Sequence, residues 1–427
     1  MKIAKITSFE VLDSRGRPTL CTKVILEDGS VGTAFVPSGA STGKLEAHEL
    51  RDKDNSRYQG LGTIQAASNA ESVLKSLSDI SPEDQQAIDE RLIELDGTKN
   101  KSKLGANAIL SISLACARAT ANSLNTPLYE YLNIVYRNIS GHKSSMSIPV
   151  PMLNIMNGGC HANNDVDIQE FMIIPSSKYP FKEGLMKSVE VYMNLKKHLS
   201  DKGHSISVGD EGGFAPNLGR SEEVLETIIT SIEEIGLVYL DDISIALDCA
   251  ASELYQDNSY HLAGEGKKLS SDQMVEYITE LSKKYEIKSI EDPFDEGDWD
   301  SWKKFTKLND NLQVVGDDIF VTQEEILKKG IDENAANSIL VKLNQVGTLS
   351  ETMRTISLAK ENNFGTVISH RSGETEDTFI SDLAVAVDAK QIKTGAPARS
   401  DRTAKYNRLL IIEDELYPWV KLILYDK

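Results

Sequence analysis

The sequence has few cysteines and no long apolar run, and each absence excludes a class of protein. Its 427 residues include four cysteines, which lie far apart and form no CxxC pair. This spacing argues against a zinc site and against a disulfide framework, and it suits a reducing cytosol. No stretch approaches the roughly 18 consecutive apolar residues of a membrane-spanning helix, so we expect no span. The first ten residues alternate like a strand and lack the apolar core of a secretory signal, so we predict a cytoplasmic protein.

Basic residues are also too few to balance the acidic ones. The chain has 46 lysines and arginines against 65 aspartates and glutamates, a formal net charge of −19. Such a surface repels phosphate backbones and anionic lipids, so we expect neither nucleic acid nor a membrane as the primary partner. A small anionic substrate is compatible with this charge, because a few basic groups or metal ions can reverse the field locally.

The order of the apolar patterns predicts two domains in an α/β chain. Strand-like alternation over residues 1–65 is followed by helical patterns, which indicates an N-terminal α+β domain over residues 1–140. A polar stretch that ends in two prolines marks the boundary. Over residues 141–427, short apolar runs such as SISV (205–208) alternate with amphipathic helices. This alternation predicts βα units around a parallel sheet, and their number favours a closed β/α barrel.

Several apolar runs of the second domain end in a charged residue or a histidine. In a β/α barrel, active-site groups come from the C-terminal ends of different strands. One charge after a strand is usually the start of a solvated loop, but a series of them, acids first and bases later, is hard to explain in that way. These side chains are Asp248, Glu291, Asp317, Lys342, His370, Arg371, Ser372 and Lys393.

The three carboxylates of this series form a set of oxygen ligands with no cysteine or suitably spaced histidine beside them. Such a set favours Mg²⁺ over zinc. The alternative interpretation is three buried ion pairs with the basic residues that follow.

The basic residues suggest a general base and an anion site. Lys342 and Lys393, if forced together and buried, would lower each other's pKa, so that one of them could accept a proton. Arg371 and Ser372 would offer a guanidinium fork and a hydroxyl to a phosphate or carboxylate. Two structural ion pairs remain the alternative for the lysines.

A small-residue loop, VPSGASTGKLE (36–46), follows a strand of the N-terminal domain. It can offer backbone N–H groups and hydroxyls to a phosphate or a metal-bound oxygen, although it lacks the GxxxxGK[ST] pattern of a P-loop. We interpret residues 37–45 as a lid and Ser41 as a candidate metal ligand.

Two further glycine-containing segments carry candidate acids and a histidine. The segment VGDEGGFAPN projects Glu211 from a tight turn as a candidate acid, although DEGG is also common in ordinary surface turns. The segment NGGCHANNDVDIQEFM (157–172) carries His161 as a candidate substrate contact and places Gln169 and Glu170 at the entrance of the barrel. A lone histidine on a loop is more often simply solvated.

Taken together, these motifs resemble the enolase family. The resemblance implies a C-terminal barrel of the type ββαα(βα)₆ beside a smaller N-terminal α+β domain. It also implies reversible dehydration of 2-phosphoglycerate to phosphoenolpyruvate. The residues that carry it, in order from residue 2 to about 415, are DSRGRPT, VPSGASTG, QEFMIIP, VGDEGGFAPN, SIEDPF, VVGDD, LVKLNQVGTLSE, SHRSGETED and QIKTGAPARSDRTAKYN.

The resemblance further implies two Mg²⁺ ions, the second brought with the substrate. Asp248, Glu291 and Asp317 would bind the first ion, and Ser41 with the substrate phosphate would bind the second.

The family pattern also assigns the chemistry. Lys342 would remove the C2 proton, while Lys393 contacts the substrate carboxylate. Glu211, with Glu170 beside it, would assist departure of the C3 hydroxyl. The remaining catalytic and substrate-binding positions are Gly39, Ala40, His161, Gln169, His370, Arg371 and Ser372.

The chain departs from the family in the loop before Gln169. Where the family usually reads GGSHAGNKLAxQEF, this sequence reads GGCHANNDVDIQEF. The replacements introduce acidic residues and an asparagine into a loop that in the family closes over the substrate. The changed positions are Cys160, Asn163, Asp165, Val166 and Asp167.

Two alternatives stay open, and the loop departures bear on the first of them. One is a related enzyme that eliminates water from another phosphorylated or phosphonylated 2-hydroxy acid. The other is a surface-displayed binding protein, for which the terminal Lys427 is the only sequence support. For either enzyme the resemblance implies a homodimer or a larger homo-oligomer.

Overall fold

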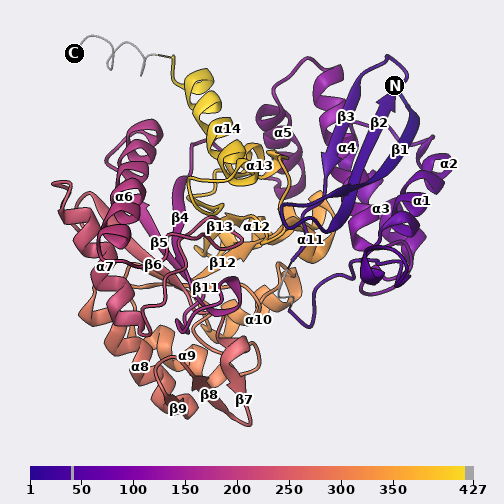
Figure 1. Cartoon of the computed structure of the whole chain (residues 1–427). Helices are drawn as coiled ribbons and strands as arrows, with labels where there is room; N and C mark the ends of the chain where they lie inside the picture. The colour runs from indigo at the N-terminus through magenta and orange to yellow at the C-terminus, as the bar shows by residue number, and fades with distance from the viewer. Residues whose placement is uncertain (40–42, 419–427) are drawn as a thin grey trace.

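The structure is a computed structural model, and it describes residues 1–39 and 43–418. Figure 1 shows a sheet with helices at the N-terminal side and a larger unit in which strands are surrounded by helices. Three positions singled out by the sequence, Ala40, Ser41 and Lys427, lie outside the described residues.

The N-terminal unit is an antiparallel sheet in the order β1–β2–β3 with helices packed against it. Its elements are β1 (Ile3–Leu12), β2 (Pro18–Leu26), β3 (Val31–Phe35), η1 (Tyr58–Gly60), α1 (Ile64–Ser72), α2 (Leu74–Leu77), α3 (Gln85–Asp96), α4 (Ala106–Ser123) and α5 (Leu128–Ser140). Helix α4 is rich in small residues and almost wholly buried. It lies so close to β3 that a Cβ at Gly32 would be 2.0 Å from the carbonyl oxygen of Ala115. Glycine and alanine at this contact therefore allow the helix to cover the sheet.

The second unit is a closed eight-stranded barrel in the order β10–β11–β12–β13–β14–β4–β5–β6. Its strands are β4 (Val150–Asn157), β5 (Glu170–Pro175), β6 (Ile243–Asp248), β10 (Ser289–Glu291), β11 (Gln313–Gly316), β12 (Ser338–Val341), β13 (Gly365–Ser369) and β14 (Gln391–Lys393). The interior is filled by apolar side chains, so the barrel is a packed core and not a pore. The predicted fold class, a closed β/α barrel with a smaller N-terminal α+β domain, is confirmed.

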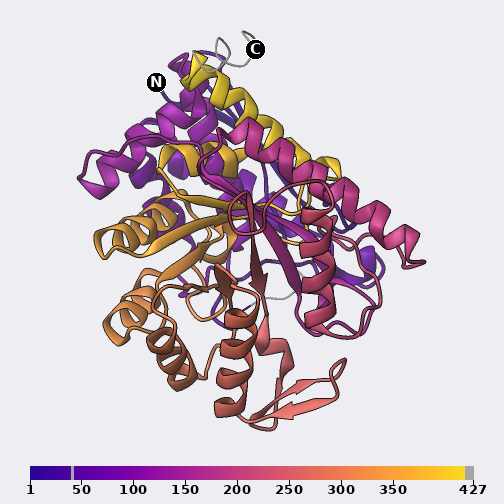
Figure 2. The same ribbon diagram turned by 90° about the vertical axis from the view of Figure 1, so that its left-hand side faces the viewer.

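Helices and short outer elements surround the barrel (Figures 1 and 2). They are η2 (Gly159–His161), α6 (Phe181–Asp201), α7 (Ser221–Glu233), η3 (Ala251–Leu254), β7 (Tyr255–Gln256), β8 (Ser259–Leu262), β9 (Lys267–Leu269), α8 (Ser271–Lys284), α9 (Trp299–Leu308), α10 (Glu324–Glu333), α11 (Leu343–Val346), α12 (Leu349–Glu361), α13 (Phe379–Ala386) and α14 (Ser400–Leu416). The apolar run at 205–208 does not form a barrel strand. These residues are exposed, and Val208 makes only an isolated bridge with Phe214.

The direction of β5 decides which of its ends reaches the active-site side. β5 runs antiparallel to both neighbours, whereas the other barrel pairs are parallel. Its first residue, Glu170, is therefore level with Asp248, the last residue of β6, and Asp248 is level with Glu291 of β10. A residue at the start of one strand thus joins residues at the ends of the others.

In the described part of the chain, no helix has both the length and the apolar character needed to cross a membrane.

A buried ion pair joins α4 to the segment that precedes α13. Both terminal nitrogens of Arg118 donate to the Asp377 carboxylate at 2.6 Å, and the backbone N–H groups of Phe35 and Phe379 donate to the same carboxylate. Burial raises the pKa of Asp377, but Arg118 and the backbone N–H groups of Phe35 and Phe379 together outweigh burial, and the net shift is downward.

We expect Arg118→Ala to lower the free energy of unfolding by about 3–5 kcal/mol, because Asp377 would stay buried without its partner. Urea denaturation measures the difference. Since the pKa of Asp377 is lowered by folding, the pair stabilises at neutral pH and its contribution disappears as the pH falls through that lowered pKa. The gap between variant and parent should therefore shrink in acid. Arg91→Ala, which removes an exposed pair with Glu94, is the control and should change stability by less than about 1 kcal/mol. Equal effects of the two substitutions would contradict this account.

Candidate active site

The polar strand ends meet in one pocket at the C-terminal end of the barrel. Most of the side chains predicted from the sequence line it, although they come from segments far apart in the chain. The predicted residues that do so are His161, Gln169, Glu170, Glu211, Asp248, Asp317, Lys342, His370, Arg371, Ser372 and Lys393.

Two predicted residues lie next to this pocket without lining it. Glu291 is 1% exposed and reaches the pocket through Lys393. Gly39 lines the neighbouring cavity together with Gly43 and Lys44, and its carbonyl accepts a hydrogen bond from Arg15 at 3.3 Å.

Lys393 lies among carboxylates. Its Nζ donates to Asp248 Oδ2 at 2.8 Å and to both oxygens of Glu291 at 2.9 Å, and it is 3.3 Å from Glu170 Oε2. Burial alone would lower the pKa of this ammonium, but the surrounding carboxylates outweigh burial and raise it well above its usual value.

Lys342 has a similar environment. It donates to Asp317, which also accepts from Gln345 Nε2 at 2.8 Å. Burial lowers the pKa of Lys342, as do Arg371 and Lys393, but Asp317 and Glu291 raise it and the net shift is upward. The expectation that the two lysines hold a lowered pKa is therefore wrong. The repulsion between them exists, but the carboxylates overcome it.

The donor set of this pocket fits a hard divalent cation. Glu291 has a pKa well above its usual value because of burial and of the nearby charges of Asp248 and Asp317, so negative charge is crowded here beyond what Lys393 compensates. Carboxylate oxygens in this arrangement are ligands for Mg²⁺. Among the described residues, the all-carboxylate group whose ligand atoms lie within 4.8 Å of one another is Asp292, Asp317 and Asp318. Asp248 and Glu291 are not part of it, and both accept hydrogen bonds from Lys393.

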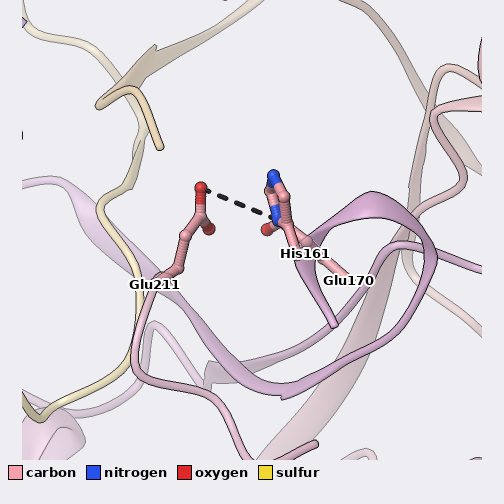
Figure 3. A group of neighbouring side chains, drawn as sticks. All are labelled: His161, Glu170 and Glu211. Atoms are coloured by element: carbon pink, nitrogen blue, oxygen red, sulfur yellow. Dashed lines mark ion pairs between the residues drawn. The ribbon is translucent and has the colours of Figure 1, made fainter. Parts of the chain in front are cut away.

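A second cluster, drawn in Figure 3, consists of His161, Glu170 and Glu211. His161 Nδ1 lies 3.6 Å from Glu170 Oε1 and 3.9 Å from Glu211 Oε1. Burial and the neighbouring Glu211 raise the pKa of Glu170 well above its usual value. Burial also acts to raise the pKa of Glu211, but His370 and His161 outweigh it and lower the value well below the usual one. The opposite directions of the two shifts favour a proton on Glu170 over one on Glu211.

His370 is neutral and its tautomer can be inferred. Burial, opposed by Glu211 but aided by Arg402, lowers its pKa to about 3. Arg402 lies 2.5 Å from His370 Nδ1, and a guanidinium can only donate. His370 Nδ1 is thus the acceptor, and Nε2 carries the proton that faces Glu211 Oε2 at 3.2 Å.

Comparison with known proteins agrees with this geometry. Residues 3–132 match the family model described as the N-terminal domain of enolase, and residues 145–422 match the enolase C-terminal TIM barrel domain. A curated protein named "Enolase" from a Nitratiruptor species is 53% identical over 419 residues, which are 97% of each chain. The chain belongs to the enolase family. As an enolase-family protein it is an enzyme of the hydro-lyase class.

The structure adds residues around the enolase-type pocket that sequence reasoning did not single out. Asp292 accepts the backbone N–H groups of Asp317 and Asp318 at 2.8 and 2.9 Å, and so fixes the direction of the β11 end. Its φ of 41° is unusual for a residue other than glycine. The only sequence signal was its position directly after Glu291.

Arg402, which is wholly buried, holds the backbone of the segment after β13. Its two terminal nitrogens donate to the carbonyls of Arg371 and Ser372 at 2.6 Å. The residue belongs to the motif QIKTGAPARSDRTAKYN, but nothing in that motif indicates this contact.

Arg371 is paired with an acid from the base of the predicted lid. Its guanidinium donates to both oxygens of Glu46, at 2.9 and 3.2 Å, and to Asn344 Oδ1 at 3.1 Å. Ser372 Oγ accepts from Arg15 at 3.4 Å. The proposed anion-binding fork is thus oriented by residues of both units.

Proposed function

We propose that this chain catalyses the Mg²⁺-dependent, reversible dehydration of 2-phospho-D-glycerate to phosphoenolpyruvate in glycolysis and gluconeogenesis. The observation that carries the proposal is the combination, in one pocket, of the buried Lys393 and the half-buried Lys342, a crowded set of carboxylates, and a glutamate pair whose pKa values are shifted in opposite directions. Elimination of water next to a carboxylate requires these three components: a base, a source of positive charge and an acid.

The first Mg²⁺ would be held by Asp248, Glu291 and Asp317, and the second by Ser41 together with the substrate phosphate. When bound, the ions supply the positive charge that stabilises the substrate carboxylate as C2 loses its proton.

The side chains of the chain itself bind the substrate and move the protons. Arg371 and Ser372 bind the phosphate. To do so, Arg371 releases the carboxylate of Glu46 and pairs with the phosphate instead. Lys342 removes the C2 proton. It can do so only in its neutral form, after it has left Asp317 and lost its own proton. The positive charges of Arg371 and Lys393 favour this neutral form, because they lower the pKa of Lys342. Lys393 contacts the substrate carboxylate.

The glutamate pair acts on the leaving group. Hydroxide leaves poorly, so it must be protonated as it departs. The proton held by Glu170 would pass through Glu211 to the C3 hydroxyl. His370, whose Nε2 lies 3.2 Å from Glu211 Oε2, and Asn154, which donates to the same oxygen at 3.1 Å, favour the ionised form of Glu211. By the family resemblance, His161, Gln169, Gly39 and Ala40 would also contact the substrate.

We further propose a cytoplasmic homodimer or larger homo-oligomer, divided into domains at 1–140 and 141–427 with a lid at 37–45. Sedimentation equilibrium tests the oligomeric state, and a monomer whose mass does not depend on concentration would contradict this proposal.

An enzyme for a related 2-hydroxy acid is the second candidate, because the loop before Gln169 departs from the family. The acidic change at Asp167 gives it little support. Its carboxylate does not line the pocket and instead accepts the backbone N–H groups of Gly264 and Glu265.

The two candidates differ in kcat/KM for 2-phosphoglycerate and for its phosphonate analogue. For the proposed function we expect kcat/KM for 2-phosphoglycerate in the range of efficient enzymes, about 10⁴–10⁸ M⁻¹s⁻¹, and a far lower value for the analogue. The reverse order would favour the second candidate.

A further inference from the structure

The segment between β4 and β5, residues 158–169, forms a closed loop at the edge of the pocket. Its two ends are joined by backbone hydrogen bonds, from Gly158 N to the carbonyl of Gln169 at 2.9 Å and from Gly159 N to that of Val166 at 2.7 Å. Asn164 Nδ2 ties the loop to the carbonyl of Pro216 at 3.0 Å. These contacts shape the loop.

Asp167 fastens this loop to a part of the molecule that contributes no side chain to the pocket. Its two carboxylate oxygens accept the backbone N–H of Gly264 at 2.9 Å and of Glu265 at 3.0 Å. Gly264 and Glu265 lie in the turn between β8 and β9, the hairpin near the bottom of Figures 1 and 2. Asp167 is 8% exposed, so these hydrogen bonds are shielded from water.

The turn is shaped to receive the loop. A Cβ at Gly264 would lie 1.7 Å from the carbonyl oxygen of Asp165, so only glycine permits this approach. The turn is itself fixed, because Glu265 accepts from the Tyr277 hydroxyl at 2.6 Å and from Ser221 N at 3.3 Å. The loop therefore packs against a turn that is itself held in place by hydrogen bonds.

The loop carries His161 to the glutamate pair. Among the described residues, His161 Nδ1 is a buried nitrogen without a hydrogen-bond partner, and it points at Glu170 and Glu211 (Figure 3). This nitrogen lies 3.6 Å from Glu170 and 3.9 Å from Glu211. It forms no hydrogen bond with a described residue that would keep it there. Its place depends on how the loop is held.

We propose that Asp167 is a positioning residue for this site, and that it holds the loop 158–169 on the β8–β9 turn so that His161 faces Glu170 and Glu211. The inference deepens the proposed function and rests on it for its kinetic part. It accounts for an acidic residue at a position where the family usually has alanine. The carboxylate of Asp167 accepts hydrogen bonds from the β8–β9 turn and does not face the pocket.

The direction of the effect on KM separates this role from its alternatives. Without Asp167 the loop would occupy other positions, and substrate binding would have to restore the competent one. We expect Asp167→Ala to raise KM for 2-phosphoglycerate about tenfold with kcat nearly unchanged at saturation. If Asp167 acted only as a negative charge near an anionic substrate, its removal would lower KM. If its role were only structural, the melting temperature would fall and KM would stay as in the parent.

Two further variants make the test specific. Asp165→Ala removes an equal charge from an exposed position of the same loop and should leave KM unchanged. Gly264→Ala keeps Asp167 but obstructs the turn, so it should raise KM in the same way as Asp167→Ala.

Amide hydrogen exchange tests the same contact without any substrate. The amides of Gly264 and Glu265 should exchange faster in Asp167→Ala than in the parent or in Asp165→Ala. Unchanged amide exchange, or a KM in Asp167→Ala equal to or below that of the parent, would overturn the proposal. An inactive parent enzyme with the expected exchange pattern would refute the proposed function and leave the contact of Asp167 supported.

Discussion

Lys342→Ala is expected to lose both the dehydration of 2-phosphoglycerate and the exchange of its C2 proton with solvent, whereas Glu211→Gln should lose dehydration alone. The base and the acid are separate groups in this pocket, since Lys342 pairs with Asp317 and Glu211 belongs to the cluster with His161 and Glu170. Removal of one should therefore leave the chemistry of the other intact.

The magnitude should be large for both variants. General acid and base groups typically contribute about 10²–10⁴-fold to a rate. Glu211→Gln keeps Lys342 and all predicted metal ligands, so C2 can still lose its proton and regain deuterium from heavy water. Because glutamine cannot carry the shared proton, the C3 hydroxyl should stay in place and almost no phosphoenolpyruvate should form.

Proton NMR of 2-phosphoglycerate in deuterated buffer with Mg²⁺ reports both results in one sample. The C2 resonance should disappear with Glu211→Gln and persist with Lys342→Ala. Exchange at the parental rate in Lys342→Ala, or normal dehydration by Glu211→Gln, would show that the roles are assigned wrongly.

Loss of a metal ligand should have the second large effect. Glu291 is fully buried among Asp248, Asp317 and Lys393, and burial together with the two aspartates raises its pKa, which reflects a site in need of positive charge. We expect Glu291→Gln, or chelation of the metal from the parent enzyme, to reduce the rate by at least about 100-fold. Titration calorimetry with Mg²⁺ alone should show weakened binding in Glu291→Gln. Glu280→Gln, an exposed position on α8, is the matched control and should behave like the parent.

The same site predicts a preference between cations. Ca²⁺ should bind but support little turnover, because its larger and looser coordination shell would misplace the substrate carboxylate. Equal rates with Mg²⁺ and Ca²⁺, or a Glu291→Gln enzyme with parental affinity for Mg²⁺, would contradict the assignment of this ligand set.

The barrel and much of its site were predictable because a buried parallel strand leaves a clear pattern, an apolar run followed by a polar residue at its C-terminal end. Asp248, Asp317, Lys342 and Lys393 were found in this way. SISV has the same composition but lies exposed, since composition alone does not tell whether a short run is covered by other elements.

The contacts that orient the site could not be predicted from the sequence. Glu46 and Arg371 are 325 residues apart, and Asp167 and Gly264 are 97 apart, so neither pair leaves a local pattern. The direction of the lysine pKa shifts was missed for a related reason. Whether an ammonium is destabilised by its neighbour or stabilised by carboxylates depends on distances that only the folded chain sets.

The measurement that tests the central claim most directly is the ultraviolet absorbance of phosphoenolpyruvate as the enzyme acts on 2-phosphoglycerate. We predict a rise in absorbance that requires Mg²⁺, stops when the metal is chelated, and runs in the opposite direction when phosphoenolpyruvate is supplied instead. An intact, folded protein that produces no such change with 2-phosphoglycerate and Mg²⁺ would contradict the proposed function.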